Sequence, residues 1–293
     1  MVLTHHRAVL VMVAVTMMWA TAGVVTRHLE HARSFEVTFW RSLFTVISLC
    51  AILPILSGRE VFAKVRHGGR VLWLSGACWC VMFTAFMLAL TMTTVANVLV
   101  TLSVGPLLTA LIAWITLGHR IPARTWLAIV VAGAGIAYMY GSDFSGGQLA
   151  GTLVAFAVPV AGAINWTITQ RSNNQNAQSP GVDLLPAVLI GACLSTLVTL
   201  PLAFPFHATA RDVSLLAFLG LVQLAIPCAL AVICARVLKA PEISLLALLE
   251  VIFGILLAWV GAGEVPAATV LTGGALVIGA LVINEVLGWR ERT

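Results

Sequence analysis

The chain has 293 residues, of which 60% are hydrophobic and only 9% are charged, and its mean hydropathy is +1.04. A soluble domain carries about 25% charged residues, so this chain has too few charges to coat a globule, and most of its surface must face lipid. The net charge of +5 comes without a basic cluster interleaved with aromatic residues, which argues against a nucleic-acid partner.

Ten stretches of the chain are apolar and long enough to cross a membrane, whose hydrocarbon core needs about 20 helical residues. The linkers between these stretches are short. We therefore predict an all-α integral membrane protein with ten transmembrane helices, at residues 8–28, 35–57, 70–92, 94–118, 124–141, 148–171, 182–205, 213–236, 243–262 and 267–288.

The loops orient these spans, because Lys and Arg accumulate in cytoplasmic loops. With the N-terminus inside, twelve of the sixteen Lys and Arg residues fall in inner segments, three fall in outer segments, and Arg41 lies in a span. This predicts a multi-pass protein of a bacterial inner membrane with both termini in the cytoplasm. The run from Ala20 to Ala22 also fits a signal-peptide cleavage site, but cleavage would leave nine spans.

A short internal repeat divides the chain. Ala113-Trp114 followed by Gly118-His119 returns 145 residues later as Ala258-Trp259 followed by Gly263-Glu264. Arg27 and Arg171 likewise close the first and sixth spans. We predict two inverted repeats, at 1–145 and 146–293, because five spans per half make the halves face opposite ways. Such repeats are typical of transporters, whose substrate site lies near the midplane between the halves.

Glu250 and Arg41 are charged side chains that lie away from the ends of predicted spans, where charge is costly. Glu250 is a candidate group for a substrate ammonium or for a coupling proton, and the alternative is a protonated carboxyl bonded to a neighbouring helix. Arg41 is a candidate for a substrate carboxylate, and the alternative, slightly favoured, is that it snorkels to the outer face.

Neutral polar residues give a second set of candidates. Asn97, Asn165 and Thr101, which is one turn from Asn97, offer hydrogen bonds to a zwitterion without the cost of a buried charge. The alternative for the two asparagines, which we favour slightly, is hydrogen bonding between helices.

Four aromatic side chains fall in the interior of spans rather than at the interfaces where Trp is common: Trp19, Trp79, Phe83 and Trp166. They are candidates for walls that stack on a planar or aromatic substrate. The alternative, again slightly favoured for any one of them, is ordinary packing.

Proline interrupts candidate cavity helices in both halves, at Pro106 and Pro159. Each removes a backbone donor and permits a kink, so each is a candidate flexing point for gating. A static kink that shapes the cavity is an equal alternative.

Several functions lack their sequence signatures. The six cysteines lie in apolar stretches, no histidine lies deep in a span, and no P-loop or zinc-protease motif occurs. We therefore expect neither a metal nor another cofactor, no catalytic residues, and no ATP hydrolysis by the P-loop route.

Trp19-Ala20, Arg41, Gly105-Pro106, Gly118, Leu249-Glu250-Val251 and Gly263-Glu264 together carry a family likeness. The chain resembles the drug/metabolite transporter (DMT) superfamily of EamA type, with the closest likeness to bacterial YddG-type exporters of aromatic amino acids. It departs from the family pattern at His119, where Glu is frequent, and at Val251, where Pro is frequent.

The resemblance implies a basket of helices in which spans one to four and six to nine line or gate a central cavity, while spans five and ten brace it. The pairs Gly133-xxx-Ala137 and Ala275-xxx-Gly279 are small enough to let the bracing helices approach closely.

These observations lead to a hypothesis with two alternatives. We expect a secondary transporter, monomeric in the lipid bilayer, that exports aromatic or large neutral amino acids and related metabolites by alternating access. Facilitated movement down the solute's own gradient is favoured over proton coupling, because one ambiguous acid is thin evidence for a coupling site. The first alternative is efflux of cationic drugs or metabolites, with Glu250 as the counter-charge or proton site. The second alternative is a membrane enzyme or receptor.

Overall fold

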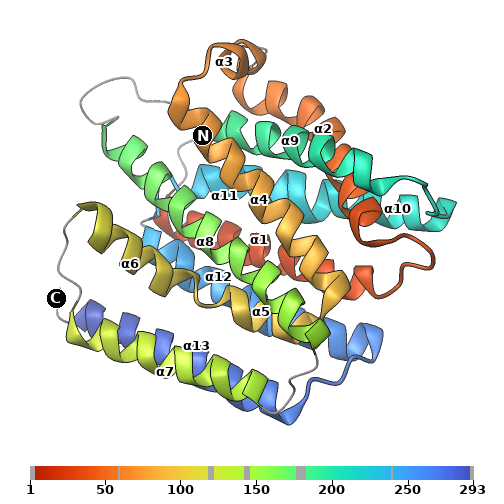
Figure 1. Cartoon of the computed structure of the whole chain (residues 1–293). Coiled ribbons are helices and arrows are strands. Elements are labelled where there is room, and N and C mark those ends of the chain that lie inside the picture. Colours follow the sequence, from red (N-terminus) through yellow and green to blue (C-terminus); the bar gives the residue numbers. More distant parts are fainter. Residues whose placement is uncertain are drawn as a thin grey trace.

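The computed structural model describes residues 4–58, 60–117, 122–141, 146–175, 183–238 and 240–290, and every regular element in these ranges is a helix (Figure 1). Gly118 and His119 lie outside the described residues. The elements are α1 (His5–Thr26), α2 (Ser34–Ser57), α3 (Val61–His67), α4 (Arg70–Met92), α5 (Val95–Leu102), α6 (Gly105–Leu117), α7 (Ala123–Gly141), α8 (Gly146–Gln175), α9 (Leu185–Ala203), α10 (Ala210–Phe218), the π-helix η1 (Leu219–Ala225), α11 (Ile226–Cys234), α12 (Ala240–Ala262) and α13 (Ala268–Arg290).

Each of the ten predicted ranges coincides with one helix or one run of helices. Within the described residues, seven segments are long and apolar enough to span a membrane, and three shorter apolar helices occupy the remaining ranges, at Trp126–Gly135, Leu246–Ala262 and Ala268–Asn284. The multi-pass, all-helical class is therefore supported, while the number of ten passes stays a prediction.

Two predicted spans are broken. The fourth divides into α5 and α6 at Ser103 and Val104, and the eighth contains the π-helix η1 between α10 and α11. π-helices are rare, and they are frequent at functional sites. Both interruptions lie at the middle of the molecule, beside the cavity described below.

The helices of the two halves pack in matched pairs. α2 packs on α9, and α7 packs on α13 along one edge of the molecule (Figure 1). The contact of α1 with α12 has its counterpart in the contact of α8 with α5 and α6. The contact of α1 with α11 likewise has its counterpart in the contact of α8 with α4. Exchanging each span for its counterpart five spans along maps this set of contacts onto itself. These are the pairings that an inverted repeat requires, and the repeat itself stays a prediction.

The helices α7 and α13 approach closely, but not at the predicted small residues. A Cβ on Gly135 would lie 2.9 Å from the Gly273 carbonyl oxygen, whereas Gly133 and Gly279 have open space beside them. The prediction that Gly133 and Gly279 mediate this contact was therefore wrong. A small residue does mediate the contact between α7 and α13, but it is Gly135, which lies on a different face of α7 from Gly133.

Two buried acids tie the loops of the predicted outer side. The Asp212 carboxylate, at the start of α10, accepts the backbone N–H groups of residues 30–32 at 2.7–3.0 Å. The Glu36 carboxylate, in the first turn of α2, accepts those of His207 and Ala208 at 2.9 and 2.7 Å. Each acid thus satisfies backbone donors of a loop from the other half of the chain, which holds α1, α2, α9 and α10 together at this end.

Candidate functional site

A central cavity with a volume of about 180 Å³ lies among α1, α2, α4, α5, α6, α8, η1, α11 and α12. Neither α7 nor α13 contributes a lining residue from the described part of the chain, as expected for bracing helices. The seventh span, α9, was expected to line or gate the cavity; it contributes no lining residue and packs on α2 and α4, and a role in gating stays a prediction. The lining combines two ionisable side chains, several aromatic rings and the two predicted prolines.

Arg41 reaches the cavity from α2 and has no exposure to the outside. Its Nη1 donates to the Gln223 side-chain oxygen at 3.1 Å, its Nη2 donates to the Phe83 carbonyl oxygen, and no described residue accepts from its Nε. The guanidinium carbon also lies 6.0 Å from the centre of the Phe86 ring. The snorkelling alternative for Arg41 is therefore wrong, because the side chain turns inward and is held there by two acceptors.

The π-helix η1 explains how Gln223 reaches Arg41. Pro227 lacks the N–H that would bond the Gln223 carbonyl in an α-helix, and the π-helix ends at Ala225, two residues before it. Gly220 lets η1 lie against α2, since a Cβ there would be 2.8 Å from the Arg41 carbonyl oxygen and 2.9 Å from the Thr45 nitrogen. The backbone irregularity thus brings the Gln223 amide against the guanidinium.

Glu250 enters the cavity from α12, on the opposite half of the chain from Arg41. Its side chain is half-buried, and among the described residues no group donates a hydrogen bond or forms an ion pair with its carboxylate. The alternative of a carboxyl bonded to a neighbouring helix is not what these contacts show. The cavity therefore holds one basic and one acidic side chain that do not pair with each other.

The four predicted aromatic residues all line the cavity. The Trp79 ring lies 5.4 Å from the Phe83 ring on α4 and 6.1 Å from the Trp166 ring on α8, the second pair edge to face. Trp79 and Phe83 are buried, while Trp19 and Trp166 are half-buried. The aromatic surface is thus built from three helices that are far apart in sequence.

The three neutral polar candidates are buried, but none of them lines the cavity that the described residues form. Asn165 on α8 accepts a hydrogen bond from the Ser75 hydroxyl on α4 at 2.6 Å. The Asn97 amide donates to the Thr93 hydroxyl at 3.1 Å, and Thr101 donates to the Asn97 carbonyl at 2.8 Å. Asn165 thus joins α8 to α4, as the alternative for the asparagines has it, whereas Asn97 bonds to the residue that ends α4 and Thr101 bonds within α5.

Pro106 and Pro159 both line the cavity, one from each half of the chain. Pro106 lies in the first turn of α6, directly after the break in the fourth span, so it begins a helix rather than kinking one. Pro159 lies inside α8, and a Cβ on Gly105 would be 3.8 Å from its Cβ. Their role in gating stays a prediction.

Sequence reasoning missed Gln223, Phe86 and Cys228 in the cavity wall. Gln223 had a signal that could have found it, because it is the one amide in the predicted eighth span and lies four residues before a proline. Phe86 and Cys228 had none, since each is one apolar residue among many on its helix. The described residues contain no group of three or more potential metal ligands.

Comparisons with known proteins agree with this architecture. Among 27 matching chains of solved structures, one described as "Crystal structure of protein" has a TM-score of 0.63 at 17% identity, and the match covers 98% of this chain and 99% of that one. That likeness shows the fold alone. The search of curated protein sequences found no match. The family model that matches is the EamA-like transporter family, over residues 6–141, so the first half of the chain carries a domain of this family within the DMT superfamily.

Proposed function

We propose that the chain is a secondary transporter of the DMT type that carries zwitterionic amino acids, with aromatic or large neutral side chains preferred. The family domain in residues 6–141 supports the transporter class. The paired helices of the two halves support alternating access, because two pseudo-equivalent halves allow two conformations that open to opposite sides. Movement down the solute's own gradient, in an exporting direction across a bacterial inner membrane, completes the proposal.

The observation that carries the substrate class is the presence, in one apolar cavity, of a basic and an acidic side chain that do not bond to each other. Arg41 and Glu250 come from opposite halves of the chain, and each lines the cavity. A free amino acid brings a carboxylate and an ammonium, so it offers a partner of opposite sign to each side chain. The Arg41 Nε, which is buried without an acceptor, is the donor we assign to the substrate carboxylate.

The aromatic wall and the size of the cavity support a compact, planar side chain. Trp19, Trp79, Phe83 and Trp166 supply ring faces and edges beside the two charges. A cavity of about 150 Å³ is large enough to bind benzene in a protein interior. The cavity here is of similar size, at about 180 Å³, so we assign it to one small solute.

The alternative cargo is a lipophilic cation held by Glu250. Arg41 disfavours this alternative, because its buried guanidinium lines the same cavity and would repel a solute with net positive charge. A membrane enzyme or a receptor is the third reading, and it predicts no solute flux at all.

Counterflow in proteoliposomes tests the proposal. Vesicles loaded with unlabelled phenylalanine are diluted into labelled phenylalanine or tryptophan, and we expect transient accumulation of label without any ion gradient. Tetraphenylphosphonium serves as the cation probe. Accumulation of the cation but of neither amino acid would overturn the assignment, and the absence of flux for every solute would favour the third reading.

A further inference from the structure

Four helix ends meet at the predicted outer side in one charged cluster. The Arg27 guanidinium, at the end of α1, donates from Nε to Glu264 at 2.5 Å and from its two terminal nitrogens to the carbonyls of Leu90 and Thr93 at 2.8 Å. Glu264, just after α12, also accepts the Val95 N–H at 2.7 Å. One ion pair therefore ties α1 and α12 to the end of α4 and the start of α5.

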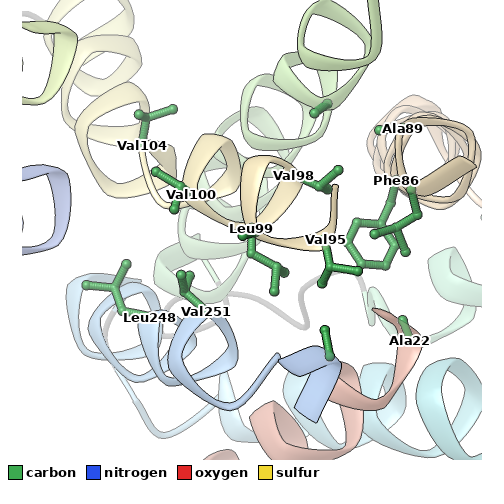
Figure 2. Packing of buried hydrophobic residues seen from close by; sticks show 14 of the residues in the cluster. Ala22, Phe86, Ala89, Val95, Val98, Leu99, Val100, Val104, Leu248 and Val251 are labelled. Atoms are coloured by element: carbon green, nitrogen blue, oxygen red, sulfur yellow. The ribbon is translucent and has the colours of Figure 1, made fainter. Parts of the chain in front are cut away.

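Close apolar packing lies directly below this cluster. A Cβ on Gly23 of α1 would lie 2.5 Å from Val95, and one on Gly254 of α12 would overlap Leu99, so α5 lies tightly against both helices. Figure 2 shows Val95 beside Phe86 and Leu99 pointing from α5 toward α12. The lining of the cavity on α5 begins at Leu99, so the first turn of α5 separates the cavity from the outer end.

The predicted inner side is held differently. The lining on α12 runs from Val251 to Ile243, the fourth residue of that helix, so the cavity extends toward the inner end. The ion pairs found there join Asp183 to Lys64 at 3.4 Å and to Arg236 at 2.9 Å. The Lys64 and Arg236 side chains are exposed and Asp183 is partly exposed, and ion pairs this open to solvent contribute little stability.

The internal repeat relates the outer cluster to residues on the inner side. Glu264 corresponds to His119 and Arg27 to Arg171 in the two copies. Arg171 is exposed, and no hydrogen bond or ion pair is seen for it in the part of the chain that the structure describes. Whatever its conformation, a histidine at 119 supplies no carboxylate. The acid of the outer pair therefore has no counterpart in the inner copy.

We propose that the Arg27–Glu264 pair is an outer latch whose missing inner counterpart makes the inward-facing state the resting state of the protein. The latch holds α5 across the outer end of the cavity, whereas the described residues of the inner end show no equivalent pair and position 119 supplies no acid for one. This inference rests on the proposed function, since it assigns a conformational preference to an alternating-access carrier. Breaking the latch, or building its equivalent inside, shifts the equilibrium toward the outward-facing state.

Hydrogen–deuterium exchange of the protein in nanodiscs, without substrate, tests the latch. Glu264→Gln keeps an oxygen for the Val95 N–H but removes the charge, and we expect exchange in residues 90–98 to rise about tenfold, as for loss of one charged hydrogen bond. Because the outward-facing state closes the inner end, exchange in residues 240–247 falls at the same time. His119→Glu, with the latch intact, produces both changes in the same directions.

Glu60→Gln is the matched control, because Glu60 is an exposed acid remote from the cluster, and it leaves both regions unchanged. Faster exchange in residues 90–98 of Glu264→Gln without slower exchange in 240–247 would overturn the proposal, since that is local loosening only. An unchanged pattern in His119→Glu would overturn the assignment of the inner counterpart. Because the exchange experiment uses no substrate, it tests the latch even if amino-acid counterflow fails.

Discussion

The two charged walls of the cavity are built in different ways. Arg41 is fully buried and held by the Gln223 side chain and the Phe83 carbonyl, and Gly220 allows the close helix contact behind it. Glu250 is half-buried and receives no hydrogen bond from the described residues. One wall is a rigid site that depends on three helices, and the other is a single side chain on one helix.

Because of this difference, substitutions at the two walls should affect stability and transport to different extents. Substitutions around Arg41 disturb helix packing as well as substrate binding, because its acceptors belong to α4 and η1. Substitution of Glu250 removes a charge that no neighbour in the described structure uses. We therefore expect substitutions at the residues that hold Arg41 to lower the free energy of unfolding, and substitution of Glu250 to leave it almost unchanged.

The largest loss is expected for Gly220→Ala. The added Cβ would lie 2.7 Å from the Phe44 Cβ and 2.8 Å from the Arg41 carbonyl oxygen, so η1 has to move away from α2. We expect the free energy of unfolding, measured by SDS titration in mixed micelles, to fall by about 2–3 kcal/mol. Gly133→Ala is the control, since open space beside it predicts no loss; equal losses for the two variants would contradict the packing described for η1.

A smaller loss is expected for Gln223→Leu. This change leaves the Arg41 Nη1 buried without its acceptor, which costs about 2 kcal/mol for a charged donor. The same SDS titration measures it. Gln223→Glu keeps an oxygen at the position and should retain stability, so a loss in the glutamate variant as large as that in the leucine variant would show that the hydrogen bond is not what matters.

Glu250→Gln should have the smallest effect on stability. Neutralising a carboxylate that has no partner in apolar surroundings leaves the free energy of unfolding unchanged or raises it by up to about 1 kcal/mol. Amino-acid counterflow should nevertheless fall. A loss of more than about 1 kcal/mol would mean that Glu250 is part of the structural framework, and the contrast between the two walls would disappear.

Much of the fold could be predicted because lipid imposes simple rules on sequence. Hydropathy located all ten ranges, since a spanning helix must be apolar over its length. The breaks within the fourth and eighth ranges could be suspected from Pro106 and Pro227 but not described. A proline marks where a backbone donor is missing, whereas the π-helix also depends on the close contact between Gly220 and the backbone of α2, which the local sequence does not show.

The candidate site was predicted in part for a related reason. Interior Trp and charged residues stand out in an apolar span, and Trp19, Arg41 and Glu250 all line the cavity. Asn97 and Asn165 stood out equally, yet they contact neighbouring hydroxyls away from the lining. Direction around a helix distinguishes these cases, and direction is set by packing against helices distant in the sequence.

The most direct test of the zwitterion site is a binding cycle with three ligands. Affinities of L-phenylalanine, phenethylamine and 3-phenylpropanoate are measured by tryptophan fluorescence for the unmodified protein, Arg41→Gln and Glu250→Gln. We expect the unmodified protein to prefer phenylalanine by about tenfold or more, Arg41→Gln to lose the preference over phenethylamine alone, and Glu250→Gln to lose that over phenylpropanoate alone. Equal binding of the three ligands by the unmodified protein, or loss of both preferences in each variant, would contradict a site that reads the two charges separately.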